Sequence, residues 1–440
     1  MTRLEQAAEL VGEDPDAAYA LCLEELYDDP NSAAANTLAG VIQMRAEKYG
    51  AALGFFHRAC LLRPDKVETW NNLGACYQDM RFPLHAREVY KKALEVKENA
   101  QTCANMAVTY ADTNEWATAL KWIRRAEKHD KDSSYVAKVR CFVEIATGDW
   151  DNGWKDWART LGSKFRPDID YGAPLWQGEK VGTLLVYGEQ GLGDEIQYAS
   201  CLDDCRALAE RVIVECDPRL ESLFRRSFPW AQVHGTRRGE KPWLDDLTLD
   251  AQVPIGNLPA LFRKSPHDCP RVAYLTPDPE RVLMWRALFA SYQKPVIGLA
   301  WTGGKRRSTQ VGKRAVGLDS FRPLIESRDA VFVSLQYKDA HAEIEACGLP
   351  VRQFPEAMSY NYDDTAAMVY ALDDVIGVHT TVHHVRGAMG KASTVLVPHD
   401  PMWMYCHGDG IAWYPSSRYH RQRKSEAWRD CIARIDQPAD

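Results

Sequence analysis

The stretch Thr183–Cys201, TLLVYGEQGLGDEIQYASC, decides how the second part of this chain is expected to fold. Leu184–Tyr187 is a short apolar run typical of a buried β-strand. Gly188–Gly193 then forms a glycine-rich turn, and a helix is expected to begin near Asp194. This order of strand, turn and helix places backbone N–H groups and a helix dipole against an anionic ligand. The stretch therefore predicts an anion-binding loop at the carboxyl end of a strand in an open α/β sheet.

The totals describe a multidomain protein. At 440 residues the chain is too long for one core and is expected to form about three domains. Hydrophobic residues make up 45% and charged ones 26%, which is typical of a soluble globular protein. A formal net charge of −7 counts against nucleic acid as a partner. The N-terminal residues carry too many charges for a secretory signal, and no apolar run is long enough to span a bilayer, so a cytoplasmic protein is expected.

The chain contains 12 cysteines and no CxxC pair. Cys22, Cys60 and Cys103 fall at positions where a helix would bury them. We therefore expect reduced core thiols and no disulfide framework.

The first third of the chain repeats itself at a step of about 34 residues. The clearest copy has its marker positions at Trp70, Leu73, Gly74, Tyr77, Ala86, Tyr90 and Ala93. The copy before it has Gly40, Ala52, Phe56, Ala59 and Pro64, and the copy after it has Met106, Ala107, Tyr110, Ala119, Ile123 and Ala126. A degenerate copy ends at Gly153 and Trp157. This pattern resembles the tetratricopeptide repeat (TPR) over roughly residues 1–160.

The resemblance implies paired helices that approach closely at Gly74 and Ala86, with Trp70 and Tyr90 filling the gaps beside them. Such a TPR solenoid implies a concave groove for a protein or peptide partner. A structural arm and a dimerisation surface are the alternatives, so a homo-oligomer stays open.

Residues 161–180 lose the helical period and gather Gly and Pro, which places a domain boundary there. Beyond it, apolar strand-like runs alternate with helical stretches, which indicates parallel sheets with crossover helices. The expected strands are 184–187, 212–216, 232–234, 250–253, 296–301, 331–335, 374–378 and 394–397. We therefore expect a TPR-repeat domain at 1–162 and two Rossmann-like halves at 163–280 and 281–440, facing each other across a cleft.

Four segments in these halves carry a more specific resemblance. They are GEQGLGDEIQYAS at 188–200, Val333–Gln336, DDTAAMVYALDDVIGV at 363–378 with GAMGK behind it, and WYPSSRYHRQ at 413–422. Together they resemble bacterial TPR glycosyltransferases, which are similar to the family-nine heptosyltransferases with the two-Rossmann GT-B fold. In layout the chain is also similar to the O-GlcNAc transferases. The resemblance implies an acceptor side in the first α/β half and a nucleotide-sugar side in the second.

For catalysis, Asp194 occupies the position of the catalytic aspartate of the heptosyltransferases, in GlyAsp after the glycine turn. There a carboxylate would accept the proton of the acceptor hydroxyl. The structural alternative is a plain N-cap. Glu189 and Glu195 are the next candidates, and Gly191 and Gly193 form the turn of the donor-binding loop.

For the donor diphosphate, Thr380 and Thr381 stand where a strand becomes a helix, so hydroxyls, N–H groups and the dipole would face the phosphates. The family resemblance adds further contacts at His384, Arg314 and its neighbour Lys313, and it places His379 where many relatives have aspartate. Lys305, Arg306 and Arg307 share the loop of Arg314 and are also expected to be solvated surface.

Other residues complete the predicted site. Gln336, Asp364 and Thr365 are candidates for nucleoside contacts, with an N-cap role as the alternative for Asp364. Trp301, Trp403 and Trp413 either line the cleft or belong to the core. The spacing of His379 and His383 would put two imidazoles on one helix face, but GT-B enzymes typically hold the diphosphate without a metal, so no metal site is expected.

The leading hypothesis is an inverting, metal-independent glycosyltransferase that uses a nucleotide-sugar as substrate, needs no cofactor and takes a protein acceptor from the TPR groove. One alternative keeps this chemistry and makes the acceptor a glycan or a modified nucleobase. The other is a non-catalytic TPR scaffold with a retained GT-B shell.

Overall fold

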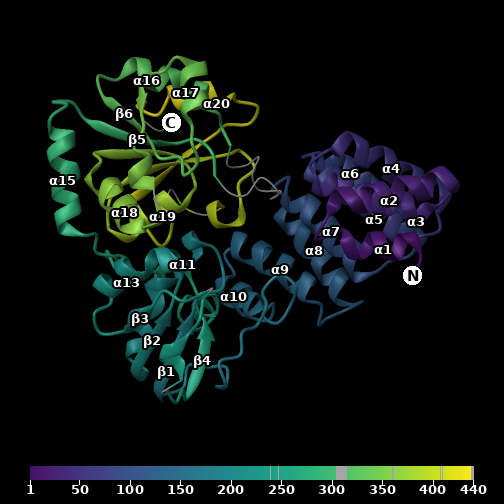
Figure 1. Cartoon of the computed structure of the whole chain (residues 1–440), viewed down its shortest axis with the longest axis horizontal. Coiled ribbons are helices and arrows are strands. Elements are labelled where there is room, and N and C mark those ends of the chain that lie inside the picture. Colours follow the sequence, from purple (N-terminus) through teal and green to yellow (C-terminus); the bar gives the residue numbers. More distant parts are fainter. Residues whose placement is uncertain are drawn as a thin grey trace. The chain divides into compact units, whose positions relative to one another are not determined.

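The computed structural model describes residues 1–237, 239–245, 247–303, 315–358, 361–406, 408 and 410–437 (Figure 1). Met1–Val143 form one compact unit, and the described residues from Glu144 onward form the other. Among the described helices, none combines the length and the apolar composition that crossing a membrane requires.

The first unit is a stack of antiparallel helix pairs, drawn in purple and blue in Figure 1. The helices are α1 (Arg3–Leu10), α2 (Pro15–Asp28), α3 (Ala33–Arg45), α4 (Tyr49–Leu62), α5 (Val67–Asp79), α6 (Pro83–Val96), α7 (Ala100–Ala111) and α8 (Trp116–Glu127), followed by α9 (Ser134–Ala146). Helices α3, α5, α7 and α9 begin at steps of 33 or 34 residues, and α3, α5 and α7 each pack against the helix that follows. The predicted repeat period is confirmed, and this region is TPR-like.

Glycines allow the two helices of a pair to approach each other. A Cβ added at Gly40 would lie 2.6 Å from Phe56 Cε1, and one added at Gly74 would collide with the ring of Tyr90. Phe56 and Tyr90 are fully buried, so neither ring can swing out into water. The predicted pairing of small residues with large ones is therefore confirmed.

Two glycine substitutions in this unit are expected to act in opposite directions. Gly54 lies inside α4 with no described atom within 4 Å of an added Cβ, so Gly54→Ala should raise the free energy of unfolding by about 0.5–1 kcal/mol. Gly74→Ala gains the same helix propensity but overpacks Tyr90, so it should be less stable than Gly54→Ala by about 1–3 kcal/mol. Hydrogen exchange of the α3–α6 amides in the full chain measures this difference. Equal effects of the two substitutions would contradict the packing described.

The second unit contains two parallel sheets with helices around them (Figure 1). Sheet one has the order β3-β2-β1-β4, from β1 (Val181–Tyr187), β2 (Ala209–Glu215), β3 (Gln232–His234) and β4 (Ala251–Pro254). Its helices are α11 (Leu192–Tyr198), α12 (Leu202–Arg206), α13 (Glu221–Ser227) and α14 (Leu258–Phe262), and α10 (Trp150–Ala158) precedes it. Every strand pair is parallel, with Leu184 opposite Val212 and Ala251. Leu184–Tyr187 is fully buried, as expected for a strand covered on both faces.

Sheet two has the order β10-β9-β8-β5-β6-β7 and is also parallel throughout. Its strands are β5 (Val296–Ala300), β6 (Val331–Ser334), β7 (Val351–Arg352), β8 (Asp374–Val378), β9 (Ser393–Val397) and β10 (Ser417–Arg421). Its helices are α15 (Pro279–Ala290), α16 (Arg322–Ser327), α17 (His341–Cys347), α18 (Tyr362–Ala371), α19 (Thr381–Ala388) and α20 (Trp428–Ala433). A core that includes Leu299, Trp301, Phe321 and Ile376 lies between this sheet and its helices.

The eight predicted strands all occur, and the parallel pairing expected from the alternation of strands and helices is confirmed. The expectation that residues 394–397 form the last clear strand is wrong, because β10 follows at Ser417–Arg421. This strand occupies an edge, and its sequence SRYHR is polar, since only one of its faces packs against the protein. β7 was also missed because two residues show no periodicity.

All 12 cysteines are free thiols, and Cys22, Cys60 and Cys103 are buried as predicted. Burial raises the pKa of Cys22 and Cys60 to about 11, which keeps these thiols protonated and unreactive.

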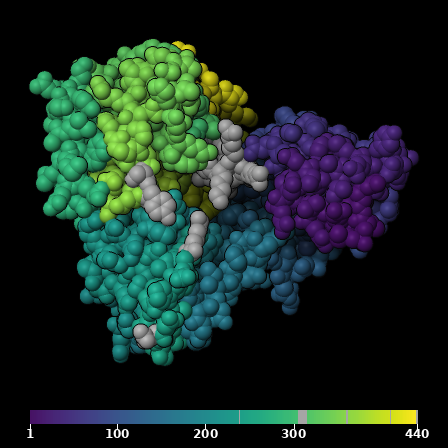
Figure 2. All heavy atoms as spheres, in the orientation of Figure 1, coloured from purple at the N-terminus to yellow at the C-terminus, as the bar shows by residue number. Residues whose placement is uncertain are grey.

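The space-filling view in Figure 2 shows the surface of α15, on which Leu283 and Met284 are exposed.

Candidate active site

The glycine turn after β1 leads into α11, whose first turn carries Asp194. The helix begins at Leu192 with Gly191 as N-cap, so the expectation that Asp194 is the N-cap is wrong. Helix α11 begins before Asp194 because Gly191 keeps the extended backbone of a cap, at φ −76° and ψ 165°, while the next residues are already helical. Asp194 is the third helical residue, and its Oδ2 accepts a hydrogen bond of 3.1 Å from the Gly191 N–H. The half-buried carboxylate therefore closes the first turn of α11.

The Thr-Thr pair lies at the start of α19. Thr380 is the N-cap, with an extended backbone at φ −139° and ψ 176°, but its hydroxyl makes no capping bond to the helix. Within the described part of the chain, Thr380 Oγ1 is buried and has no hydrogen-bond partner. The first N–H groups of a helix also lack intrahelical acceptors and carry the positive end of its dipole. The start of α19 thus offers an unused hydroxyl beside a set of N–H donors.

Helix α11 packs against α19, which brings the glycine turn and the Thr-Thr pair together. A Cβ added at Gly193 would lie 2.9 Å from His384 Cδ2 and 3.6 Å from Thr381 Oγ1. The first distance is shorter than side chains tolerate, so a residue without a Cβ is required at 193 for His384 to occupy its place. Gly193 therefore meets Thr381 and His384, which follow it by about 190 residues along the chain.

A chain of hydroxyl groups sets the orientation of His384. Tyr274 donates to the Ile196 carbonyl oxygen in α11 at 3.0 Å, and the hydroxyl of Tyr414 lies 3.4 Å from that of Tyr274. The hydroxyl of Tyr414 is also 3.0 Å from His384 Nδ1, which is its nearest acceptor. Burial raises the pKa of Tyr414 well above its ordinary value, so this hydroxyl stays protonated and shares a hydrogen bond with Nδ1 that fixes the ring.

His379 lies in the turn before α19 and not on the helix, so the expected sharing of one helix face with His383 is wrong. The His379 ring is buried and its centroid lies 4.3 Å from that of His384 and 4.9 Å from that of Tyr405. Burial lowers the pKa of His383 to about 3, which leaves a neutral ring. His379 therefore supports the His384 ring by direct packing.

Three groups of metal-binding type do approach one another within the described residues, but they lie in the TPR-like unit. Ligand atoms of Glu98, Cys103 and His129 lie within 4.8 Å of one another. Arg125 pairs with the Glu98 carboxylate, which also holds the pKa of Glu98 down at about 2. The carboxylate is therefore already neutralised by a cation.

The two glutamates that were alternatives for the base have structural partners. Glu189 pairs with Arg166 at 2.8 Å, and both side chains are buried. Glu195 is fully buried, accepts the Asp217 N–H at 2.8 Å and pairs with Arg237. Burial raises the pKa of Glu195 to about 7, against the opposing effect of Arg237. Both carboxylates thus bind other parts of the first α/β half.

The candidates for nucleoside contacts are also held by the protein. The Gln336 amide accepts the Trp301 N–H at 2.8 Å and donates to Thr302 Oγ1 at 2.7 Å, so it joins the ends of β5 and β6. Thr365 donates to the Ala357 carbonyl oxygen at 2.6 Å. The N-cap of α18 is Asn361, so the N-cap alternative for Asp364 is wrong.

Lys313 and Arg314, together with Lys305, Arg306 and Arg307, lie outside the described residues. The residues on either side of them show where their loop leaves and returns. Thr302 and Ala315 form an antiparallel bridge at the end of β5, and a Cβ added at Gly303 would lie 2.5 Å from Thr380 Cγ2. The end of β5 therefore lies next to the start of α19, and the contact of Arg314 with a phosphate stays a prediction.

Two of the three candidate tryptophans are buried, and the third contacts α10. Trp301 belongs to the core of sheet two and donates to Glu343 at 2.8 Å. Trp413 stacks on Trp150 with ring centroids 5.0 Å apart, and Trp403 contacts Trp154 at 5.9 Å. Helix α10 thus packs its tryptophans against the core of the second unit.

The role of α10 was not predicted, although its aromatic side chains recur at a helical spacing. Trp154 contacts Tyr198 of α11 at 5.9 Å and Trp413 at 6.0 Å, so one side chain touches both α/β halves. Tryptophans at 150, 154 and 157 are three and four residues apart, and this spacing could have identified a buried stripe.

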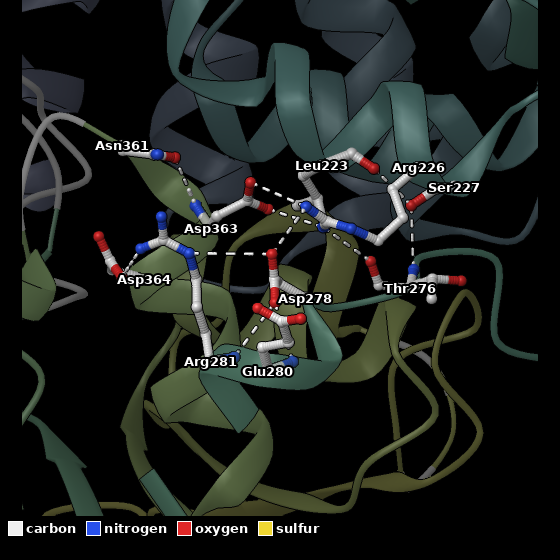
Figure 3. A network of polar contacts seen from close by, with 10 residues as sticks. All are labelled: Leu223, Arg226, Ser227, Thr276, Asp278, Glu280, Arg281, Asn361, Asp363 and Asp364. Atoms are coloured by element: carbon white, nitrogen blue, oxygen red, sulfur yellow. Dashed lines mark hydrogen bonds and ion pairs between the residues drawn. The ribbon is translucent and has the colours of Figure 1, made fainter. Parts of the chain in front are cut away.

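A network of ion pairs between the two halves was also missed (Figure 3). Arg226 of α13 forms two hydrogen bonds with the buried Asp363 of α18, at 2.8 and 3.0 Å. Asp278 lies 3.5 Å from Arg226 and 3.9 Å from Arg281, and Arg281 pairs with Asp364. This network of ion pairs holds α13 of the first half against α15 and α18 of the second.

The chain thus joins a TPR-like stack of helices to two parallel α/β sheets that meet at α11 and α19. No protein-family model matches it. Protein FlbA of Caulobacter vibrioides is 26% identical over an alignment 463 residues long, and this alignment covers 90% of this chain and 76% of that protein.

Solved structures with a similar fold include TPR proteins that match about a third of the chain. A thermophilic TPR protein of Thermus thermophilus is 18% identical, with a TM-score of 0.33, over 36% of this chain and 88% of its own. PilW, a type IV pilus biogenesis factor, is 18% identical, with a TM-score of 0.34, over 36% of this chain and 74% of its own. The TPR-like character of the first unit rests on its own helix pairing and not on these scores.

Proposed function

We propose that the chain is an inverting glycosyltransferase of the GT-B type, which moves a sugar from a nucleotide-sugar to a hydroxyl or amide acceptor. The observation that carries this proposal is the meeting of Gly193 with Thr381 and His384 between the two parallel sheets. Open α/β sheets bind ligands at the carboxyl ends of their strands, where both the glycine turn and the Thr-Thr pair lie. A ligand held there would contact the first α/β half through the glycine turn and the second through the Thr-Thr pair.

The start of α19 would hold the diphosphate of the donor. Its first N–H groups and the helix dipole attract an anion, and the unused Thr380 hydroxyl adds one more donor. The imidazole of His384 lies on the same side, beside Gly193, and would add a ring N–H donor when Nε2 carries the proton. These donors stabilise the negative charge that grows on the diphosphate as the sugar departs, without a metal ion.

Asp194 would act as the base. The acceptor oxygen forms a bond with the anomeric carbon while the bond from that carbon to the diphosphate oxygen breaks. The acceptor proton passes to the Asp194 carboxylate, and the bond electrons leave with the diphosphate, so a single displacement inverts the anomeric centre. The Gly191 N–H donates to Asp194 Oδ2 and so holds the carboxylate in the first turn of α11.

The TPR-like unit would present a polypeptide acceptor, because stacked helical repeats form extended surfaces for protein partners. A chain with 12 free cysteines and no disulfide is suited to the cytoplasm, where we place this activity. If Asp194 is inactive, the fold would instead serve as a scaffold that binds proteins, and a scaffold should not bind nucleotide-sugars.

Substituting Thr380 tests the diphosphate site. Because its hydroxyl has no partner within the described residues, Thr380→Val should leave the unfolding free energy unchanged or raised, and the retained methyl keeps the contact with Gly303. If the hydroxyl binds phosphate, affinity for the nucleoside diphosphate that binds wild type best among UDP, GDP and ADP should fall about 10-fold. Calorimetric titration measures this change.

Thr365→Val is the matched control, because Thr365 donates to the Ala357 carbonyl oxygen inside the protein. It should lose stability and keep the affinity for nucleotide. Unchanged nucleotide affinity in Thr380→Val would remove the hydroxyl from the donor site.

A further inference from the structure

A pocket of about 580 Å³ lies in the second α/β half, away from the start of α19. It is formed by the C-terminal turns of α15 and α18 and by the residues that precede β5, β8 and β9. Its polar lining consists of Arg286, Gln293, Lys294, Tyr370, Asp373 and Lys391. The pocket therefore opens at the amino ends of the strands, whereas Thr380 follows the carboxyl end of β8.

Two cations in this pocket have no carboxylate partner. Arg286 Cζ lies 5.6 Å and Lys391 Nζ lies 4.6 Å from the centroid of the Tyr370 ring. Neither side chain forms an ion pair within the described residues. The other two charged groups are already engaged, because Lys294 pairs with Asp329 at 2.5 Å and the Asp373 carboxylate accepts the Val296 N–H at 2.7 Å. The pocket thus holds two cations without a direct ion pair, although the Asp373 carboxylate is a nearby negative charge that acts on Lys391.

A third cation lies behind them. Arg386 is buried and donates to the carbonyl oxygens of Leu372 at 3.2 Å and Asp373 at 3.0 Å, so its guanidinium is fixed by the backbone. Burial lowers the pKa of Lys391, and the positive charges of Arg386 and Arg286 lower it further. An anion in the pocket would relieve this repulsion.

We propose that this pocket binds a small molecule that carries a phosphate monoester, with Arg286 and Lys391 as its phosphate ligands. A phosphate monoester has about two negative charges near neutral pH, which match the two unpaired cations, whereas a carboxylate would balance one of them. A guanidinium also takes two phosphate oxygens at once. The volume lies within the range of small-molecule sites, about 300–1,000 Å³.

This site is separate from the proposed donor site. The five residues of β8 lie between Asp373 in the pocket and the turn that leads to Thr380. At about 3.3 Å per residue, the two places lie on the order of 15 Å apart. A ligand in the pocket would therefore not touch the start of α19, and the inference does not depend on the proposed transfer activity.

Acetylation of lysines by acetic anhydride, read by peptide mass spectrometry on the full chain, tests the proposal at the level of one residue. Glycerol 3-phosphate serves as the phosphate monoester, and glycerol as its neutral counterpart. Glycerol 3-phosphate should slow acetylation of Lys391 several-fold, while glycerol should have no effect. The exposed Lys424 should react equally in both conditions.

Two variants make the result specific. Arg286→Gln, at an exposed position, should raise the concentration of glycerol 3-phosphate needed for half-protection about 10-fold. Thr380→Val should leave that concentration unchanged, which separates this pocket from the donor site. Equal acetylation of Lys391 with and without glycerol 3-phosphate would overturn the proposal, and so would equal protection of Lys424. Half-protection at the wild-type concentration in Arg286→Gln would also overturn it, because Arg286 would then not be a phosphate ligand.

Discussion

Asp194→Asn is expected to lower the rate of sugar transfer by about 10²–10⁴-fold and to leave donor binding nearly unchanged. The amide oxygen of asparagine can still accept the Gly191 N–H, so the first turn of α11 should remain intact. What the variant loses is the ability to take the acceptor proton. The release of nucleoside diphosphate from the donor, with water as the acceptor, measures this step even before the natural acceptor is identified.

Asp203→Asn is the matched control, because Asp203 is exposed on the neighbouring α12 and should keep the full rate. Normal rates in Asp194→Asn, in both hydrolysis and transfer, would refute the base assignment. Asp194 would then be a residue that only closes the helix turn, and the scaffold alternative would gain weight.

Arg166→Leu is expected to lower the free energy of unfolding of the second unit by about 3–5 kcal/mol, because it leaves Glu189 buried without its partner. The guanidinium also donates to Asn257 Oδ1 at 2.8 Å and to the Trp157 carbonyl oxygen at 2.7 Å. Arg166 therefore joins α10, the glycine turn and the end of β4 through one side chain. Denaturant unfolding of the full chain measures the loss.

The double variant Arg166→Leu with Glu189→Leu is expected to recover most of that loss, since no unpaired charge then remains in the core. Lys155→Leu is the matched control. It breaks an exposed pair with Asp151 inside α10, which should change stability by less than about 1 kcal/mol. Equal losses in the double variant and in Arg166→Leu would show that the hydrogen bonds of Arg166, and not its charge, stabilise this region.

The order of strands and helices in both sheets could be predicted because buried parallel strands are continuous apolar runs. β8 occurs at the predicted residues, Asp374–Val378, and four of its five residues are buried. The edge strand β10 could not be recognised, because its sequence is polar on an exposed edge. The repeat period was equally readable, since Gly40 and Gly74, 34 residues apart, each face one ring of the next helix.

For the candidate site, the sequence indicated the residues that local geometry governs and missed those that depend on distant partners. Gly193 and Thr381 follow from a strand–turn–helix pattern in each half, His384 follows from the family resemblance, and the three residues do meet. Arg226 and Asp363 are 137 residues apart, and no spacing connects them.

Arg166 shows a further limit, because it lies in a segment that reads as a linker. Its sequence is rich in Gly and Pro, yet the Arg166 side chain is fully buried. Burial of an arginine requires partners from elsewhere in the chain, here Glu189 and Asn257, which local composition does not reveal.

The proposed sugar transfer requires that an anionic nucleotide binds where α11 meets α19. The most direct measurement is calorimetric titration of the full chain with UDP-, GDP-, ADP- and CMP-sugars. At least one of them is expected to bind with micromolar affinity, about −8 kcal/mol, and to bind more weakly to Thr380→Val. If none of the four binds measurably to the wild-type chain, the sugar-transfer function is contradicted and a TPR-bearing scaffold remains.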